Sequence, residues 1–544
     1  MPANGATPNG QVTRRKFLST ATATGVGAAV ARWLPGLELG RGPAALAAAP
    51  TPIKGGTFVF SRGGDAITLD PCETKENESE SRVVQMFEGL VAVKPGGTEL
   101  IPALAEKWES SAGGTVWRFF LRRNVKFQDG TGFDADAVVF NFDRWRLADN
   151  PYHKGDFNVW QFLMGGFPGT MKDVKALDKY TVQFTLDKPM GPFLAYLAGP
   201  AFMLNSPASI KADPDNVFKN PVGTGAYKLV EWRRGDQVVM ERFKDYWGEA
   251  NFDRTVIKVI PDSTARFLQL KAGAINAMDD PNPDDVVTAR SDRTLQVYLR
   301  DYWAVGTINV NHDLKPLGNV KVRWAIAYAI DRQGLMPLYQ GMATPGNQAQ
   351  SPTSWAFNPD LPPIPHDPAK AKALLAEAGY PNGLDTDLWY MPIARPYYPA
   401  PKEIAQKMAA DLAAVGIRVT LKTEDWGAYM NNRAGKYPMW MFGGWSSVMD
   451  PSWLLYTYYG QKAAQEGNYD NARVRTLMEN AQYHVDQKQR AQWYKQAAKI
   501  TYDEMARIPV VFARTGAVLA SARVKDFPTS VLRQEQYQYA WMTR

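Results

Sequence analysis

The sequence predicts a mixed α/β protein with at least two lobes. The chain has 544 residues, which is more than one hydrophobic core usually serves. Its first half contains short strand patterns separated by turn signals, whereas its second half alternates helical and strand patterns. No repeat with a period of about 20–50 residues occurs, which argues against a solenoid or a propeller.

The first segment, residues 1–47, has the features of an export signal in the expected order. Arg14 and Arg15 precede a weakly apolar stretch, and Ala45-Leu46-Ala47 has the small-x-small pattern of a cleavage site. The paired arginines resemble a twin-arginine (Tat) signal peptide. The apolar stretch is too short and too glycine-rich for a spanning helix, and no cysteine marks the cleavage point. We therefore expect a soluble periplasmic protein without a lipid anchor.

Composition argues against several classes of function. Removal of residues 1–47 lowers the formal charge from +7 to about +3, and the remainder has no basic run longer than two residues, so we expect no nucleic-acid partner. Cys72 is the single cysteine, which excludes an intrachain disulfide. The four histidines lack the spacing of metal ligands, and neither a metal site nor a cofactor is expected. These histidines are His153, His312, His366 and His484.

The first half is predicted to consist mainly of strands. Thr57–Phe60 is apolar and β-prone, Thr115–Leu121 alternates in part, and Thr181–Leu186 alternates as a half-buried strand does. Gly63-Gly64 ends the first strand, and Arg234-Gly235-Asp236 is the turn of a hairpin. The predicted strands are Thr57–Phe60, Thr115–Leu121, Thr181–Leu186, Tyr227–Trp232 and Gln237–Met240.

In the second half, helices are predicted to alternate with strands. Asp367 is a capping residue, and Pro368 takes the first position of a helix that Gly379 ends. A second apolar stripe at helical spacing runs from Ile404 to Val415. The other predicted elements are strand Arg418–Leu421, helix Gln487–Ala506 and strand Ile508–Phe512.

Several short motifs occur in an order that is characteristic of one family. They are Phe87–Leu90, Pro102–Trp108, Leu121–Gly130, Asn220–Tyr227, Asp245–Gly248 and Asp262–Arg266. This series resembles the extracellular solute-binding proteins of ABC importers, family 5, the group of oligopeptide, dipeptide and nickel receptors. The resemblance covers about residues 54–540. Within these motifs, Gly223, Gly225 and the pair Asp129-Gly130 are expected to form tight turns.

The resemblance implies a two-lobed periplasmic binding protein fold of cluster C type, with a hinge and an extra inserted domain. Domain I would combine 54–90, 217–305 and 510–544, domain II would be the insertion 91–216, and domain III would be 306–509. Hinge closure would enclose a ligand between domains I and III. The implied partners are the permease and ATPase subunits of an ABC importer, and the binding protein itself is expected to be a monomer.

The segment 391–399 resembles the dipeptide-receptor motif Met-Pro-Val-Gln-Arg-Pro-Tyr-Asn-Pro, whose arginine holds the ligand's C-terminal carboxylate. A guanidinium meets a carboxylate through two parallel charge-assisted hydrogen bonds. The resemblance therefore implies that Arg395 is the carboxylate clamp and that Tyr397 is a neighbouring wall. The alternative is that Arg395 forms a salt bridge within its own lobe.

The acid that would hold a peptide's ammonium group is absent from its expected position. Peptide receptors of the family carry it in a Trp-x-x-Asp motif, and Val448 stands there in this chain. A buried ammonium without a carboxylate is costly, so we expect weak affinity for free dipeptides. Asp450 is a candidate replacement. Asp450-Pro451 is equally the pattern of a helix start with Asp450 as the cap.

Aromatic and backbone groups complete the predicted site. Trp445 and the tyrosines that follow it are expected to offer aromatic surface near the cleft. The opposite wall would offer backbone donors, together with Asp65 as another ammonium partner. The candidates on that wall are Ser61, Gly63, Gly64 and Asp65.

The expected function is the substrate-binding component of an ABC importer for a small carboxylate-bearing solute, such as a short peptide or a peptide-like compound. No bond is made or broken in that role. A secreted hydrolase is the alternative from another class, although the sequence has no Gly-x-Ser-x-Gly elbow and no His-Glu-x-x-His motif. A metal or haem complex, or another non-peptide solute, stays open as the ligand. A role in chemotaxis or folding also stays open.

Overall fold

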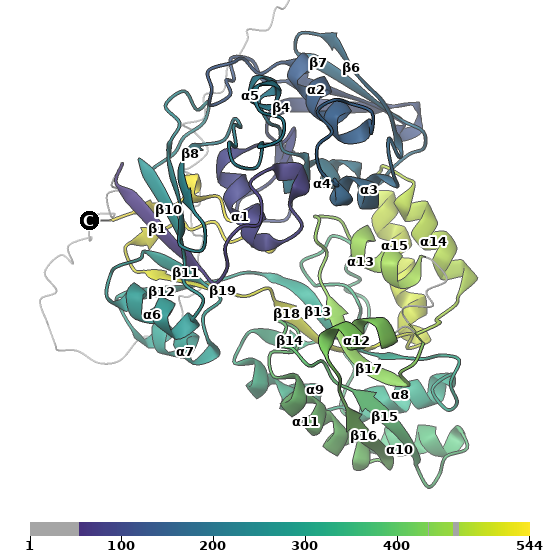
Figure 1. Cartoon of the computed structure of the whole chain (residues 1–544). Coiled ribbons are helices and arrows are strands. Elements are labelled where there is room, and N and C mark those ends of the chain that lie inside the picture. The colour runs from purple at the N-terminus through teal and green to yellow at the C-terminus, as the bar shows by residue number, and fades with distance from the viewer. Residues whose placement is uncertain (1–53, 434, 461–466, 544) are drawn as a thin grey trace, which may run out of the picture. The chain divides into compact units, whose positions relative to one another are not determined.

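The structure is a computed structural model that describes residues 54–433, 435–460 and 467–543 (Figure 1). The predicted signal peptide, 1–47, lies outside the described residues. Thr51–Arg544 forms one compact unit. In the described ranges, no helix combines the length and the apolar character needed to cross a membrane.

A seven-stranded sheet has the order β12-β19-β11-β1-β10-β9-β8. Its strands are β1 (Thr57–Arg62), β8 (Tyr227–Arg233), β9 (Gln237–Arg242), β10 (Arg254–Val259), β11 (Ala277–Asp279), β12 (Leu295–Leu299) and β19 (Ala517–Ser521). Strand β1 lies between β10 and β11 and is parallel to both. The C-terminal β19 pairs with β11 and β12, so distant chain segments build one sheet (Figure 1).

Aromatic packing forms the core beside this sheet. Phe58 and Phe60 of β1 are fully buried, and the ring of Phe58 stacks on Phe252 with centroids 4.9 Å apart. Burial of large aromatic side chains contributes strongly to core stability. The helices of this part are α1 (Asn77–Met86), α6 (Ser263–Lys271) and α7 (Pro283–Ser291).

A four-stranded antiparallel sheet has the order β4-β5-β7-β6. Phe119 and Phe184 from adjacent strands meet edge to face at 5.3 Å, and Phe142 of the covering helix meets Phe184 at 4.7 Å. The elements are β4 (Ala105–Ser111), β5 (Val116–Leu121), β6 (Met171–Asp178), β7 (Thr181–Leu186), α2 (Ala135–Arg146), α3 (Asn158–Met164), α4 (Phe193–Leu197) and α5 (Pro207–Ala212).

A six-stranded sheet has the order β14-β18-β13-β17-β15-β16. Its strands are β13 (Tyr302–Val310), β14 (Ala343–Pro345), β15 (Leu384–Trp389), β16 (Ile417–Lys422), β17 (Met439–Gly444) and β18 (Ile508–Arg514). The associated helices are α8 (Val320–Ala329), α9 (Arg332–Leu335), α10 (Pro368–Glu377), α11 (Pro401–Ala413), α12 (Trp426–Asn432), α13 (Ser452–Tyr459), α14 (Ala472–Gln482) and α15 (Gln487–Asp503). Short strand pairs are β2 (Val91–Val93) with β3 (Leu100–Pro102) and β20 (Val524–Lys525) with β21 (Trp541–Met542).

The chain crosses between the seven-stranded and six-stranded sheets at 300–301 and at 515–516. The two crossings contact each other, because the Arg300 amide donates to the Gly516 carbonyl at 3.1 Å and Arg514 donates to the Arg300 carbonyl at 3.0 Å. Gly516 has φ of +127°, which L side chains rarely adopt. The predicted domain limits at 305 and 510 fall inside β13 and β18.

The predicted helices and strands are found, with two corrections. Helix α15 ends at Asp503 rather than Ala506, because Met505 has a positive φ of 42°. The Asp129-Gly130 turn is present, with Gly130 at φ +88°. Gly223 and Gly225 have no positive φ; a Cβ on Gly225 would lie 2.6 Å from the backbone of Met86. Close approach of two chain segments, rather than a tight turn, therefore explains Gly225.

Candidate functional site

The segment 391–399 follows β15 and contains a tight turn. The Arg395 amide donates to the Tyr398 carbonyl at 3.0 Å, and the Tyr398 amide donates to the Arg395 carbonyl at 2.8 Å. Pro396 suits the second position of such a turn because its ring presets φ. Tyr397 and Tyr398 are buried, whereas Arg395 is partly exposed. The turn fixes the backbone of Arg395 and leaves its side chain partly accessible.

The guanidinium of Arg395 rests on an aromatic ring. Its central carbon lies 5.3 Å from the ring centroid of Trp426, the first residue of α12. Within the described part of the chain, no carboxylate pairs with Arg395 and its side chain donates no hydrogen bond. A cation–π contact leaves the N–H groups of a guanidinium available to another acceptor. The predicted alternative, a salt bridge within its own lobe, is not found among these residues.

Tyr397 connects the Arg395 turn to the neighbouring loop. The side chain is 4% exposed, and a Cβ on Gly443 would lie 2.7 Å from its ring. Its ring centroid lies 6.2 Å from that of Trp445. Burial raises the pKa of Tyr397 to about 12, so the phenol is neutral at physiological pH. Tyr397 is therefore an uncharged aromatic link between Arg395 and Trp445.

The loop after β17 carries Trp445 and Val448. The Trp303 indole donates to the Ser446 carbonyl at 2.8 Å, and the Ser446 hydroxyl donates to the Asp450 carbonyl at 2.7 Å. These bonds hold the loop in place. Trp445 and Val448 line a cavity of about 190 Å³. The position at which the family motif implies an aspartate is therefore apolar in this chain and faces a cavity.

This cavity lies where distant parts of the chain meet, and the sequence reasoning missed two of its polar residues. Glu80 comes from α1 and Gln534 from the C-terminal segment, 454 positions apart. The Gln534 amide donates to Glu80 Oε2 at 2.9 Å. Burial raises the pKa of Glu80, and the Gln534 hydrogen bond only partly offsets it. No local motif marks either residue, because only the fold brings them together.

Asp450 is engaged inside the protein. It is 3% exposed, and its two carboxylate oxygens each lie 2.7 Å from a guanidinium nitrogen of Arg490. The Ser452 amide donates to Asp450 Oδ1 at 2.9 Å at the start of α13. Asp450 does not line the cavity of Trp445 and Val448. The Asp450 carboxylate is therefore engaged inside the protein rather than displayed to a ligand, and Asp450 stands one residue before Pro451, which is the N-cap of α13.

The four candidates of the opposite wall lie outside the cavity of Trp445, and two of them are bonded within their own lobe. They are Ser61, Gly63, Gly64 and Asp65, and none of them lines the cavity that contains Trp445. The Gly64 carbonyl accepts from Arg82 at 2.7 Å. Asp65 accepts from the Trp232 indole at 3.1 Å and from the Gly235 amide at 2.8 Å. Because these bonds fasten Asp65 to the β8–β9 turn, its placement departs from the expected role as an ammonium partner.

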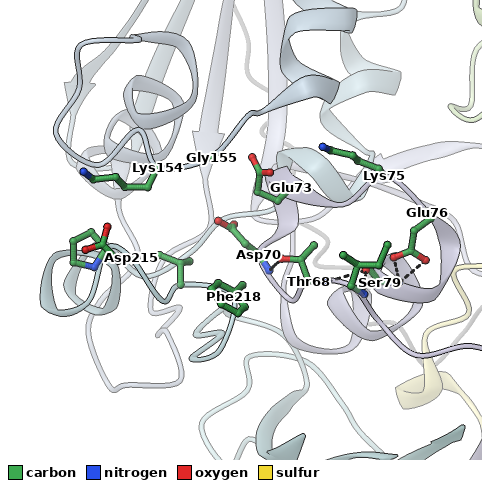
Figure 2. A pocket seen from close by; sticks show the side chains of 13 residues that line it. Thr68, Asp70, Glu73, Lys75, Glu76, Ser79, Lys154, Gly155, Asp215 and Phe218 are labelled. Carbon is green, nitrogen blue, oxygen red and sulfur yellow. Dashed lines mark hydrogen bonds between the residues drawn. The ribbon is translucent and has the colours of Figure 1, made fainter. Parts of the chain in front are cut away.

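A second cavity, of about 490 Å³, contains none of the predicted site residues (Figure 2). It shares Lys75 with the smaller cavity. Two of its acids already have partners: Asp70 pairs with Arg144 at 2.5 Å, and Glu73 accepts from the Phe157 amide at 2.7 Å. The larger cavity therefore adjoins the cavity of Trp445 at Lys75, and the predicted site residues lie outside it.

The described residues contain no cluster of three or more histidine, cysteine, aspartate or glutamate side chains that could hold a metal ion. His312 is half-buried, and a ring nitrogen lies 2.9 Å from the Ala506 carbonyl. Burial lowers the pKa of His312 to about 4, so the ring is neutral at physiological pH.

Comparisons with known proteins agree with these features. The family described as bacterial extracellular solute-binding proteins, family 5 Middle, matches residues 99–466. The chain is 34% identical to the dipeptide-binding protein of Escherichia coli (strain K12), over 86% of this chain and 91% of that protein. It is 33% identical to heme-binding protein A of Haemophilus influenzae, over 87% of this chain and 90% of that protein.

A solved structure of HbpA2 from Haemophilus parasuis has a TM-score of 0.84 to this chain at 29% identity, and covers 90% of this chain and 100% of that one. These matches confirm the predicted family and the predicted fold class. This chain belongs to the bacterial extracellular solute-binding proteins, family 5.

Proposed function

We propose that this chain is the exported binding component of an ABC importer and that it captures a small carboxylate-bearing solute. The observation that carries the proposal is the state of Arg395. Its guanidinium is held by a fixed turn and an aromatic ring, and no carboxylate of the described residues pairs with it. A ligand carboxylate would accept two parallel hydrogen bonds from this guanidinium.

Other arginines of the chain support this interpretation by contrast. Arg144 and Arg490 are buried, and each is paired with a buried aspartate. Such pairing is expected because a buried charge without a partner is costly. Arg395 is partly exposed instead, where it can remain hydrated until a ligand displaces the water.

The ligand class follows from the groups around Arg395. Trp445, which is half-buried and lines a cavity, offers a neutral aromatic surface that suits the apolar part of a short peptide or a peptide-like compound, and the buried Tyr397 packs behind it. The similarity to a dipeptide-binding protein supports this choice. A haem or metal–chelate complex is the second candidate, because the chain is also similar to a heme-binding protein and haem carries carboxylates of its own.

The proposed mechanism is binding coupled to closure, without chemical change of the ligand. The paired crossings at 300–301 and 515–516 supply a hinge of two short segments. Closure about such segments encloses a ligand between lobes. The closed form would then be recognised by the permease. The twin-arginine pattern in residues 1–47 supports export to the periplasm before this cycle begins.

The test begins with the ligand that the protein retains during purification. Native mass spectrometry of the purified chain identifies the retained ligand and shows whether it is chemically unchanged. Isothermal titration then compares the wild type with Arg395→Gln. We expect the variant to bind about 100-fold more weakly, because one partner of an enclosed charge pair is removed.

Arg418→Gln is the matched control. Arg418 is an exposed arginine on β16, and its partner Asp385 is also exposed. The Arg418→Gln variant should bind the ligand as tightly as the wild type does. An Arg395→Gln variant that retains full affinity, or a retained ligand without an acidic group, would refute the carboxylate clamp. A ligand that the protein cleaves would favour the hydrolase alternative.

A further inference from the structure

The part of the molecule around the six-stranded sheet has a noncovalent connection to the part around the four-stranded sheet. Gly191 lies between β7 and α4; its amide donates to the Gln482 carbonyl at 2.7 Å, and its carbonyl accepts from Arg490 at 3.1 Å. Gln482 ends α14, and Arg490 belongs to α15. Both helices lie next to the four-stranded part in Figure 1. We call these two hydrogen bonds the Gly191 contact.

The Gly191 contact is closely packed. A Cβ on Gly191 would lie 2.5 Å from the His484 carbonyl oxygen, 2.6 Å from Arg490 Nε and 2.7 Å from the Ala481 carbonyl oxygen. Gly191 has no positive φ, so close approach of two chain segments, rather than backbone conformation, explains the glycine. Any larger side chain at this position would push the turn between α14 and α15 away.

Arg490 extends the contact to the loop after β17, which carries Trp445. Two of its guanidinium nitrogens each lie 2.7 Å from a carboxylate oxygen of Asp450, and its Nε donates to the Ala481 carbonyl at 2.7 Å. Arg490 and Asp450 are both 3% exposed. A bidentate pair has a defined geometry, so one side chain holds Gly191 and the end of this loop in a fixed relation.

The same loop also packs against the neighbouring parts between the Gly191 contact and the chain crossings. Val448 joins the hydrophobic core of the four-stranded part. Met449 packs with Trp303, which follows the first crossing, and with Val531 and Leu532 of the C-terminal segment. The crossings, this loop and the Gly191 contact therefore form a connected row of contacts. The guanidinium of Arg395 rests on Trp426, within the six-stranded part.

Two retained connections restrict how the six-stranded part can move. The crossings at 300–301 and 515–516 are covalent and cannot separate. Separation of the Gly191 contact would remove a charge-assisted hydrogen bond from the buried Arg490 guanidinium, which is costly. A rigid part that stays attached at two places can rotate only about the line that joins them. Closure is therefore favoured about an axis through the crossings and Gly191.

We infer that the Gly191 contact is the second pivot of lobe closure and that Arg490 is a positioning residue for the loop that carries Trp445. This inference rests on the closure that the proposed function describes at the crossings. The crossings by themselves would also allow the six-stranded part to twist. A second pivot reduces closure to one rotation, which brings Arg395 to the same place each time. The four-stranded part would then guide closure, although it contains none of the predicted site residues.

The test measures two distances between spin labels by pulsed electron paramagnetic resonance. The contact pair, at Asp187 and Lys488, spans the Gly191 contact, and both residues are exposed. The sheet-edge pair, at Val230 of β8 and Thr420 of β16, reports on the lobes, and both of these residues are also exposed. Strands β8 and β16 form the edges of the two large sheets that lie farthest from the crossing strands.

Closure is followed in the purified protein carrying Cys72→Ser, because the native cysteine would compete for the label. A mixture of free dipeptides is the first probe, and haem is the second. A probe that closes the lobes should shorten the sheet-edge distance. The contact distance should then change by no more than about 2 Å, the usual range of sliding between packed elements. A larger increase in the contact distance on closure would overturn the pivot.

Gly191→Ala tests the pivot without any probe. In the ligand-free protein this variant should lengthen the contact distance and broaden the distribution of the sheet-edge distance. Gly132→Ala is the matched control, because a Cβ on Gly132 has no atom within 4 Å. A purely structural role of Gly191 would change the contact distance and leave the remote sheet-edge distribution as it is in the wild type.

A second variant keeps the test valid if Gly191→Ala does not fold. Arg490→Lys retains a cation beside Asp450 but lacks the guanidinium fork that also reaches the Gly191 carbonyl. It should change both distances in the same direction as Gly191→Ala.

The outcomes separate this inference from the proposed function. A sheet-edge distance that neither probe shortens would contradict closure around these solutes, and the response to Gly191→Ala would still decide on the pivot. A sheet-edge distribution that stays as narrow in Gly191→Ala and Arg490→Lys as in Gly132→Ala would refute the pivot, whether or not the lobes close.

Discussion

The charged side chains beside the hinge are paired with one another, whereas the guanidinium of Arg395 has no carboxylate partner among the described residues. Asp279, at the end of β11, is 1% exposed and lies 2.8 Å from Arg62, 2.8 Å from Arg300 and 3.0 Å from Arg533. Arg300 also pairs with Glu535 at 2.7 Å. Arg395, by contrast, contacts the ring of Trp426 and no carboxylate among the described residues.

Under the proposed function, one side-chain type serves two purposes. Buried guanidiniums must be neutralised inside the protein, so the cluster around Asp279 joins β1, β11 and the C-terminal segment beside the crossing strands. A guanidinium that is left without an internal partner keeps its capacity for a ligand. The first arrangement should determine stability and the second should determine affinity, and the predictions below test that division.

The largest effect is expected for Asp279→Asn. The variant leaves three arginines around a neutral side chain, and it should lower the free energy of unfolding by about 3–5 kcal/mol. Urea unfolding of the ligand-free protein measures this change. Asp245→Asn is the control, because the Asp245–Lys126 pair is exposed and should contribute less than about 1 kcal/mol. Equal unfolding midpoints for the two variants would contradict the assignment of stability to the buried cluster.

The same cluster predicts a loss of stability in acid. Burial by itself would raise the pKa of Asp279, but Arg300, Arg533 and Arg62 outweigh it and hold the pKa well below its usual range. Folding therefore favours the ionised form of Asp279. This stabilisation is complete above the pKa of an aspartate in the unfolded chain, which is about 3.9. It disappears as pH falls further through the folded pKa. The stability gap between wild type and Asp279→Asn should be constant from pH 7 to pH 5 and shrink below about pH 4.

The smallest expected effect is a gain in stability rather than a loss, and it concerns Glu80→Gln. Burial raises the pKa of Glu80, so its ionised form opposes folding at neutral pH in the ligand-free protein. Glu80→Gln should therefore stabilise that form by about 0.5–1 kcal/mol at pH 7, and the gain should vanish in acid, where both side chains are neutral. Thermal unfolding at pH 7 and pH 4 measures the difference. A variant less stable than the wild type at pH 7 would assign Glu80 to the framework instead.

The strands and helices that local patterns predicted are present in this fold. Strand alternation located β7, and the Asp367-Pro368 start located α10, where the Asp367 side chain accepts from the Lys370 amide at 2.9 Å. The family resemblance also marked Arg395 and Tyr397 from one short segment. Local patterns did not reveal partners that come from distant segments, such as Trp232 for Asp65 and Arg490 for Asp450.

The sequence by itself determined the family, the alternation of elements and the turn that presents Arg395. These depend on caps, turn residues and hydrophobic periodicity, which act over a few neighbouring residues. Only the tertiary structure decided which charges are neutralised internally and which face a cavity. Glu80 and Gln534 are 454 positions apart and meet because α1 and the C-terminal segment pack together. Whether a carboxylate is engaged or available depends on that packing, since the side chain alone does not specify its partner.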